Sequence, residues 1–495
     1  MSSSEYFESF GPVLGLNPAA TAYIPDVEKS DQILYENISA IFALGSNRGE
    51  HLDEKPVIIE LSPSKSIERH QRRLFLNSLA YLLDYATGGD SVTAIALQQL
   101  PGSVVYWFAS NRMPHPRACR YPEQHLETLL SSLEKLRIAS IEDGTKILRQ
   151  LVVEVFNFSS QRIDKYISCY QSSFNAAWRD LQDLRPQNVE LARSLQNMGD
   201  AASSLPTSTA SRLSTCQMSW DFKHSKQYRE LCLQAQDNET HADRLETLRH
   251  FIERLSHTLN AVKAIADSAK FAWFEELSRS YTVSRFSSSQ PIPSPFVGCT
   301  LTLNAIVTRL LNRSRPTNHS TDALPGLSEL DSNGALSNAL RRNFNNRNWK
   351  VKVHAEILLL DHFWAMDIRL VGNDPFIACS KDACYCRLLY FSAHPGGFQV
   401  PASHQNCYLA WGVPDVSTDT VYDRQFLENT HVIILKEMNE TIETDIIHQL
   451  ERRQLPRPSR RDSFSSVRLV DLSDYGSESS DPEQDSEDIS SSGSV

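Results

Sequence analysis

Long apolar runs are absent from this sequence, which has no stretch of about 18 apolar residues of the kind that spans a membrane. Its start, MSSSEYFESFGPVLG, lacks the basic and apolar regions of a secretory signal peptide. We therefore expect no membrane contact and an intracellular location, with no choice between cytoplasm and nucleus. An excess of basic residues is also missing, because the net charge is −11 at pH 7. That charge argues against a general nucleic-acid coat and still allows a local basic groove.

Cysteine is scarce outside one short segment. Of the nine cysteines, four crowd together, namely Cys379, Cys384, Cys386 and Cys407. This distribution indicates a metal or thiol site rather than a disulfide framework, and reduced thiols fit an intracellular protein.

The length and composition predict a globular protein with more than one core. The chain has 495 residues, of which 41% are hydrophobic and 22% are charged, enough for two or three domains of about 150 residues each. Residues 1–283 are predicted to form a mainly α-helical N-terminal region, in which apolar residues recur at helical spacing from Leu245 to Ala266. Within this region the Ser/Thr/Ala-rich stretch 197–215 predicts a loop.

The remaining segments divide by composition. Residues 284–296 concentrate Ser and Pro and predict a linker, so a second domain is expected at 297–420, followed by a helix at 421–451. Residues 452–495 begin with arginines and continue in Ser, Asp and Glu with almost nothing to bury. We expect this tail to be disordered.

The second domain contains residues whose types and spacing indicate a catalytic or metal-binding site. A His-x-Glu pair, His354 and Glu356, precedes Cys384 by 30 residues (384 − 354 = 30), which is room for one helix and one strand. Zinc-dependent deaminases have this layout: one His and two Cys hold Zn²⁺, and a Glu that is not a ligand moves protons. A lone His-x-Glu occurs by chance and buried cysteines often act as small hydrophobes, but the order of the two halves favours the deaminase layout.

Three motifs carry a family resemblance: HAEILLL, CSKDACYC and VPASHQNCYLAWGVP. They resemble the fungal deaminase-like branch of the nucleotide and nucleic-acid deaminase superfamily, over roughly residues 299–415. The resemblance implies an α/β fold, a cytidine-deaminase-like three-layer α/β/α sandwich after the helical region and before the disordered tail. It implies that His354 and Cys384 are zinc ligands and that Glu356 is the catalytic proton shuttle.

The sequence departs from the family pattern at Arg387, where the pattern has a cysteine three residues after Cys384. A guanidinium cannot ligate zinc. Cys386 is the expected third ligand if the turn at Cys384 stays open, with Cys379 as the alternative; Cys407 or His404 substitute only if the fold brings them close. A metal-free pseudoenzyme is the remaining interpretation.

Basic residues gather before the His-x-Glu pair, in a region with few acidic ones. They are Arg309, Arg313, Arg315, Arg341, Arg342, Arg347, Lys350 and Lys352. With nearby aromatics they suit phosphates and bases, although a solvated helix face explains them equally well. Asn346 and Trp349 from this region, and His404 from the third motif, are the candidate substrate-binding residues.

Two functions remain open. The first is a zinc-dependent hydrolytic deaminase of a nucleobase, nucleotide or nucleic acid, in which Glu356 passes a proton from metal-bound water to departing ammonia. The second is a non-catalytic pseudo-deaminase that binds nucleic acid, or a protein partner through its helical region or tail.

Overall fold

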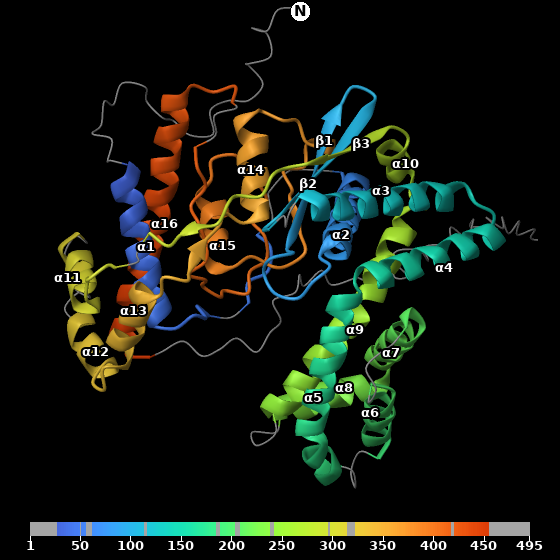
Figure 1. Cartoon of the computed structure of the whole chain (residues 1–495), viewed down its shortest axis with the longest axis horizontal. Helices are drawn as coiled ribbons and strands as arrows, with labels where there is room; N and C mark the ends of the chain where they lie inside the picture. Colours follow the sequence, from blue (N-terminus) through green and yellow to red (C-terminus); the bar gives the residue numbers. More distant parts are fainter. Residues whose placement is uncertain are drawn as a thin grey trace, which may run out of the picture.

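The computed structural model of the protein describes residues 27–49, 51–55, 62–112, 116–184, 189–202, 208–237, 242–295, 298–313, 322–416 and 420–454. Within these ranges the fold is mixed α/β and mostly helical (Figure 1). The strands are β1 (Thr93–Leu100), β2 (Ser103–Ser110), β3 (Tyr281–Arg285), β4 (Ile292–Pro293), β5 (Lys350–Val351) and β6 (Ala378–Cys379). The helices of the first half are α1 (Val27–Ala43), α2 (Pro63–Leu83), α3 (Pro116–Ile138), α4 (Ile141–Phe158), α5 (Ser160–Leu184), α6 (Val189–Ala202), α7 (Thr209–Lys223), α8 (Lys226–Asp237), α9 (Ala242–Ser268) and α10 (Ala272–Ser278). Those of the second half are α11 (Leu303–Arg313), α12 (Ala323–Leu330), α13 (Ala335–Asn345), α14 (Ala355–Ala365), α15 (Tyr385–Ala393) and α16 (Arg424–Arg452), with a 3-10 helix at Val371–Asn373.

A four-stranded sheet, in the order β3-β2-β1-β6, joins distant parts of the chain. β1 and β2 form an antiparallel hairpin that turns at Gly102, whose φ of 73° suits glycine. β6 pairs antiparallel with β1, with Ala94 opposite Cys379, and β3 pairs parallel with β2. The cysteine motif therefore shares its sheet with residues 93–110, from the predicted N-terminal region.

Helices cover both faces of this sheet. Along β1, Ile95 and Leu97 point into one hydrophobic core, shared with α2 and α9, whereas Ala94 and Ala96 point into a second core, shared with α14 and α15. Figure 1 shows α14 and α15 between the strands and the α1–α16 pair. The cytidine-deaminase-like sandwich itself stays a prediction.

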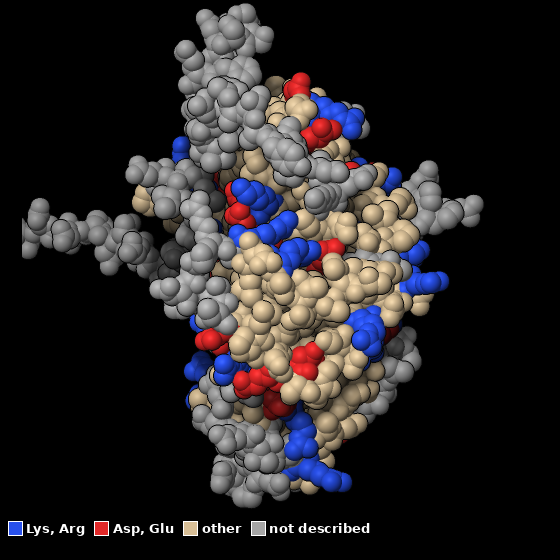
Figure 2. All heavy atoms as spheres, turned by 90° about the vertical axis from the view of Figure 1, so that its left-hand side faces the viewer, with Lys and Arg blue, Asp and Glu red and all other residues tan. Residues whose placement is uncertain are grey.

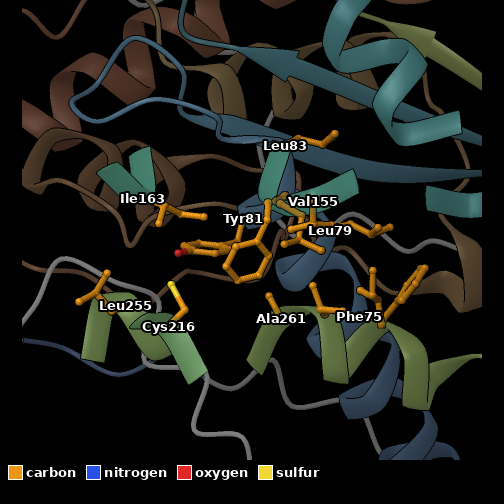
Figure 3. Packing of buried hydrophobic residues seen from close by; sticks show 14 of the residues in the cluster. Phe75, Leu79, Tyr81, Leu83, Val155, Ile163, Cys216, Leu255 and Ala261 are labelled. Carbon is orange, nitrogen blue, oxygen red and sulfur yellow. The ribbon is translucent and has the colours of Figure 1, made fainter. Parts of the chain in front are cut away.

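The first core holds the helical part of the chain together. In Figure 3, side chains of α2, α4, α5, α7 and α9 converge on one another, among them Tyr81, Cys216 and Leu255. The helical stripe of α9 is confirmed, because Leu245, Leu248, Ile252 and Leu255 are buried.

The predicted loop at 197–215 is wrong where the structure describes it, since α6 and α7 occupy most of it. Small residues there permit close packing between helices. A Cβ on Gly199 would lie 2.4 Å from the ring of Phe174, so the absence of a side chain lets α6 approach α5.

The C-terminal helix predicted at 421–451 is confirmed as α16, which packs against α1 and α15. An Asn37 to Asn439 hydrogen bond of 2.9 Å links α1 and α16. The domain boundary at 284–296 stays a prediction; β3 ends inside that segment and β4 lies within it. Beyond residue 454 the predicted tail lies outside the described residues. No described helix combines the length and apolarity needed to cross a membrane.

Candidate functional site

His354 immediately precedes α14, in extended backbone (φ −75°, ψ 146°). Asn111, just after β2, accepts a hydrogen bond from the Ala355 N–H at 2.8 Å and donates from its amide to the Gly89 carbonyl at 2.8 Å. Asn111 thereby satisfies the helix end, a task that normally falls to the residue at the position of His354. The imidazole is left to face the site. Sequence reasoning missed Asn111; the one available signal was its residue type, which is common at helix N-termini.

Cys384 holds the matching position before α15, again in extended backbone (φ −73°, ψ 166°). The segment 402–406 braces this turn, because the Tyr385 N–H donates to the Asn406 carbonyl at 2.9 Å. The Cys384 Sγ lies 3.8 Å from His354 Nδ1. Two helix N-termini, whose partial positive charge favours anionic groups, therefore meet at one point.

Arg387 and Glu356 form a buried ion pair between the first turns of α15 and α14, with side chains 3% and 2% exposed. The guanidinium also donates to Cys379 Sγ at 3.2 Å and to the Lys381 carbonyl at 2.9 Å. The Cys379 thiol lies 3.5 Å from Glu356 Oε2. One arginine side chain thus ties α14, the end of β6 and α15 together.

These charges stabilise one another. Burial alone would raise the pKa of Glu356, but the Arg387 guanidinium and His354 hold that pKa well below its usual range. Burial would likewise lower the pKa of His354, yet the Cys384 sulfur and the Glu356 carboxylate raise it to about 9. At neutral pH, Glu356 is therefore an ionised carboxylate held between two cations.

Cys386 lies in the first turn of α15, two residues after Cys384. Its side chain is fully buried in the second core, and its thiol is hydrogen-bonded with that of Cys407, a contact that raises the Cys386 pKa well above its usual value. The structure gathers His354, Glu356 and Cys384, whereas the Cys386 thiol is hydrogen-bonded with Cys407.

His404 borders the site. Its Nδ1 accepts from the Asn406 N–H at 3.0 Å, and its ring centroid is 5.8 Å from that of Tyr408, which is 43% exposed. Burial lowers the pKa of His404 to about 3, and the positive charge of Arg387 adds to this effect. The neutral imidazole of His404 and the exposed Tyr408 therefore lie beside the charged side chains of the site.

The other two candidate substrate residues make their contacts elsewhere. The Asn346 side chain accepts from the Asn348 N–H at 3.1 Å, which closes a local turn. The Trp349 ring stands edge-on to Phe42 of α1, with centroids 6.0 Å apart. Their assignment to substrate stays a prediction.

The basic residues before the motif do not form one free surface. Some have acidic partners: Arg309 pairs with Glu36, Arg313 with Glu443 at 3.7 Å, and Lys352 with Asp90. Others are exposed, namely Arg341, Arg342, Arg347 and Lys350. Figure 2, which faces the left-hand side of Figure 1, shows Lys and Arg in several separate groups with Asp and Glu among them. Arg315 lies outside the described residues.

The donor set does not fit a three-ligand zinc site in this arrangement. Among the described residues, no group of three His, Cys, Asp or Glu side chains is placed to hold a metal ion. His354 and Cys384 supply two donors, and a catalytic zinc normally needs three protein ligands. The neighbouring guanidinium of Arg387 cannot be the third, and the assignment of Cys386 or Cys379 to that role stays a prediction.

Comparison with known proteins bears on the same segment. A family model described as "OTT_1508_deam:-like deaminase" matches residues 353–415, which include His354, Glu356, His404 and four of the nine cysteines. The chain contains a deaminase-like domain. No curated protein and no solved structure matches the chain. The match begins next to His354, so it leaves out β1 and β2, which complete the sheet on which the deaminase-like domain is built.

Proposed function

We propose that the deaminase-like domain of this protein is a non-catalytic binding module, in which the Arg387–Glu356 ion pair stands where a deaminase carries out proton transfer. The observation that carries this proposal is the guanidinium on the Glu356 carboxylate. A general acid-base group must take up and release a proton near the working pH. Glu356 sits between Arg387 and His354 and its pKa is far below that range, so it is a poor proton shuttle.

The same side chain also explains how the domain holds its shape with an incomplete ligand set. Arg387 links α14, the end of β6 and α15 through Glu356, Cys379 and the Lys381 carbonyl. Buried ions are stable when each is paired and hydrogen-bonded. The arginine therefore replaces, by an ion pair, the cross-link that a bound metal would give these elements.

A second candidate is a zinc-dependent hydrolytic deaminase of a nucleobase, nucleotide or nucleic acid. The observation that favours it is the 3.8 Å approach of Cys384 Sγ to His354 Nδ1 at two helix N-termini, with Glu356 two residues further along. This function requires Arg387 to leave Glu356 and a third ligand, Cys379 or Cys386, to turn toward the pair.

Elemental analysis and an ammonia-release assay on the full chain separate the two candidates. The assay screens nucleosides, nucleotides and single-stranded DNA and RNA, with Glu356→Ala as control. We expect less than stoichiometric zinc and no ammonia that depends on Glu356, and we expect Arg387→Cys to retain more zinc than the parent. One zinc per chain, with ammonia release that Glu356→Ala abolishes, would establish the enzyme instead.

A further inference from the structure

A second site lies at the other end of α14 and α15, away from the cluster of His354, Glu356, Cys384 and Arg387. A cavity of about 40 Å³ opens where the C-terminal halves of these helices meet α16 and the chain around Asp415. Asp361 and Trp364 of α14, His394 at the end of α15 and His431 of α16 line it. No lysine or arginine is among the described residues that do so.

The cavity is a negatively charged environment with carboxylate oxygens to spare. Asp361 Oδ1 accepts from the Tyr390 hydroxyl at 2.8 Å and faces His394 Nε2 at 3.5 Å, and among the described residues no donor reaches its Oδ2. Asp415 is exposed and likewise has no partner among them. The C-terminal ends of α14 and α15 add partial negative charge at the same place.

The two histidines of the cavity are already directed toward carboxylates. His394 Nδ1 accepts from the Gly396 N–H at 3.1 Å, so a neutral ring carries its proton on Nε2, toward Asp361. His431 Nε2 faces Asp31 at 3.7 Å. Both Nε2 atoms thus face carboxylates other than Asp415, and the Asp415 carboxylate is left for a ligand.

One wall of the cavity is aromatic and continues onto the surface. The Trp364 ring stacks on Tyr422 at 5.3 Å and on Phe426 at 6.0 Å between centroids. Phe426 is 41% exposed and the neighbouring Val421 is 61% exposed. Aromatic and arginine side chains are enriched at protein interfaces, where those that carry most of the binding energy fill well-packed pockets.

We propose that this cavity receives an arginine side chain from a partner protein, whose backbone lies on the aromatic rim. The planar guanidinium of arginine can donate hydrogen bonds to the Asp361 carboxylate and stack on the Trp364 indole. The compact ammonium of lysine makes both interactions less favourably. The cavity volume of about 40 Å³ fits this ligand. A buried water needs about 10–15 Å³ on the same measure, so the cavity has room for the four heavy atoms of a flat guanidinium. The cavity is separate from the cluster of His354, Glu356, Cys384 and Arg387. Arginine binding there does not depend on whether Glu356 is catalytic.

Titration calorimetry of the full chain with the blocked tripeptide acetyl-Gly-Arg-Gly-amide tests the proposal. The matched ligands are the same tripeptide with citrulline, which keeps the shape without the charge, and with lysine. We expect the arginine tripeptide to bind about tenfold or more tightly than the citrulline tripeptide. The reason is that a hydrogen bond to a charged group contributes more free energy than a tenfold change in affinity requires. Arginine should also bind more tightly than lysine.

Three variants locate the binding. Asp361→Asn keeps an acceptor for Tyr390 and should weaken arginine binding about tenfold, and Asp415→Asn should weaken it as well. Asp367→Asn is the control, because it removes the same charge just beyond α14 at an exposed position whose φ of 50° asparagine tolerates. It should leave binding unchanged.

Four results would overturn the proposal. The first is no binding of the arginine tripeptide at millimolar concentration, and the second is equal binding of citrulline or lysine. The third is equal binding by the Asp361 and Asp367 variants. The last is a dimer of the parent chain that Asp361→Asn dissociates, because this would assign the cavity to a second copy.

Discussion

Replacing Arg387 by methionine should destabilise the protein strongly and in a pH-dependent way. The substitution removes the charge and keeps most of the side-chain volume, so Glu356, whose side chain is 2% exposed, is left in the core without the Arg387 guanidinium. Removing one partner of a buried ion pair costs about 3–5 kcal/mol. The Cys379 thiol and the Lys381 carbonyl lose a donor as well.

The pH dependence follows from the Glu356 carboxyl. In the parent, its folded pKa lies below the usual value near 4.5, so the pair stabilises the protein above that pH and the contribution is lost as pH falls through the folded pKa. Without Arg387, His354 alone opposes the effect of burial, so the folded pKa of Glu356 rises relative to the parent. The cost of the substitution is therefore largest at high pH, where Glu356 is ionised, and it shrinks at low pH, where Glu356 is protonated.

Urea unfolding followed by far-UV circular dichroism at pH 7.5 and pH 5.5 measures this effect. The double variant Glu356→Gln/Arg387→Met carries no buried charge at the pair and should recover most of the lost stability. Arg369→Met, at an exposed position, is the control. A single variant that loses under about 1 kcal/mol, or as much as the double variant, would refute the argument that an uncompensated buried charge is the cause.

Three further predictions concern other parts of the fold. Asn111→Ala should cost about 1–2 kcal/mol in urea unfolding because it removes the cap of α14, whereas Asn348→Ala in an exposed turn should cost much less. Burial lowers the pKa of His125 from 6.5 to about 3, so stability should fall as pH drops from about 6.5 toward 3; by pH 5 this amounts to about 2 kcal/mol, which His125→Phe should abolish in a pH series of urea titrations. Truncation after Leu455 removes few apolar residues, so the melting temperature by calorimetry should not change, and a clear drop would contradict that expectation.

Local patterns predicted the elements that surround the site. The stripe from Leu245 to Ala266 predicted α9, because side-chain periodicity reflects contacts within a few neighbours along the chain. The same reasoning failed over 197–215. There the burial of Gly199 against Phe174, a contact between helices, outweighs the weak local preference of small polar residues.

From the sequence alone, the order and spacing of His354, Glu356 and Cys384 predicted that they share one site, and the structure places them within contact of one another. Only the tertiary structure decided what that site contains. The pairing of β6 with β1 brings Cys379 under α14, Asn111 arrives from the end of β2 to cap it, and Arg387 reaches Glu356 rather than solvent. These contacts join residues that are 23 to 285 positions apart in the sequence. The local pattern of a helix or strand does not show which distant segment it will contact.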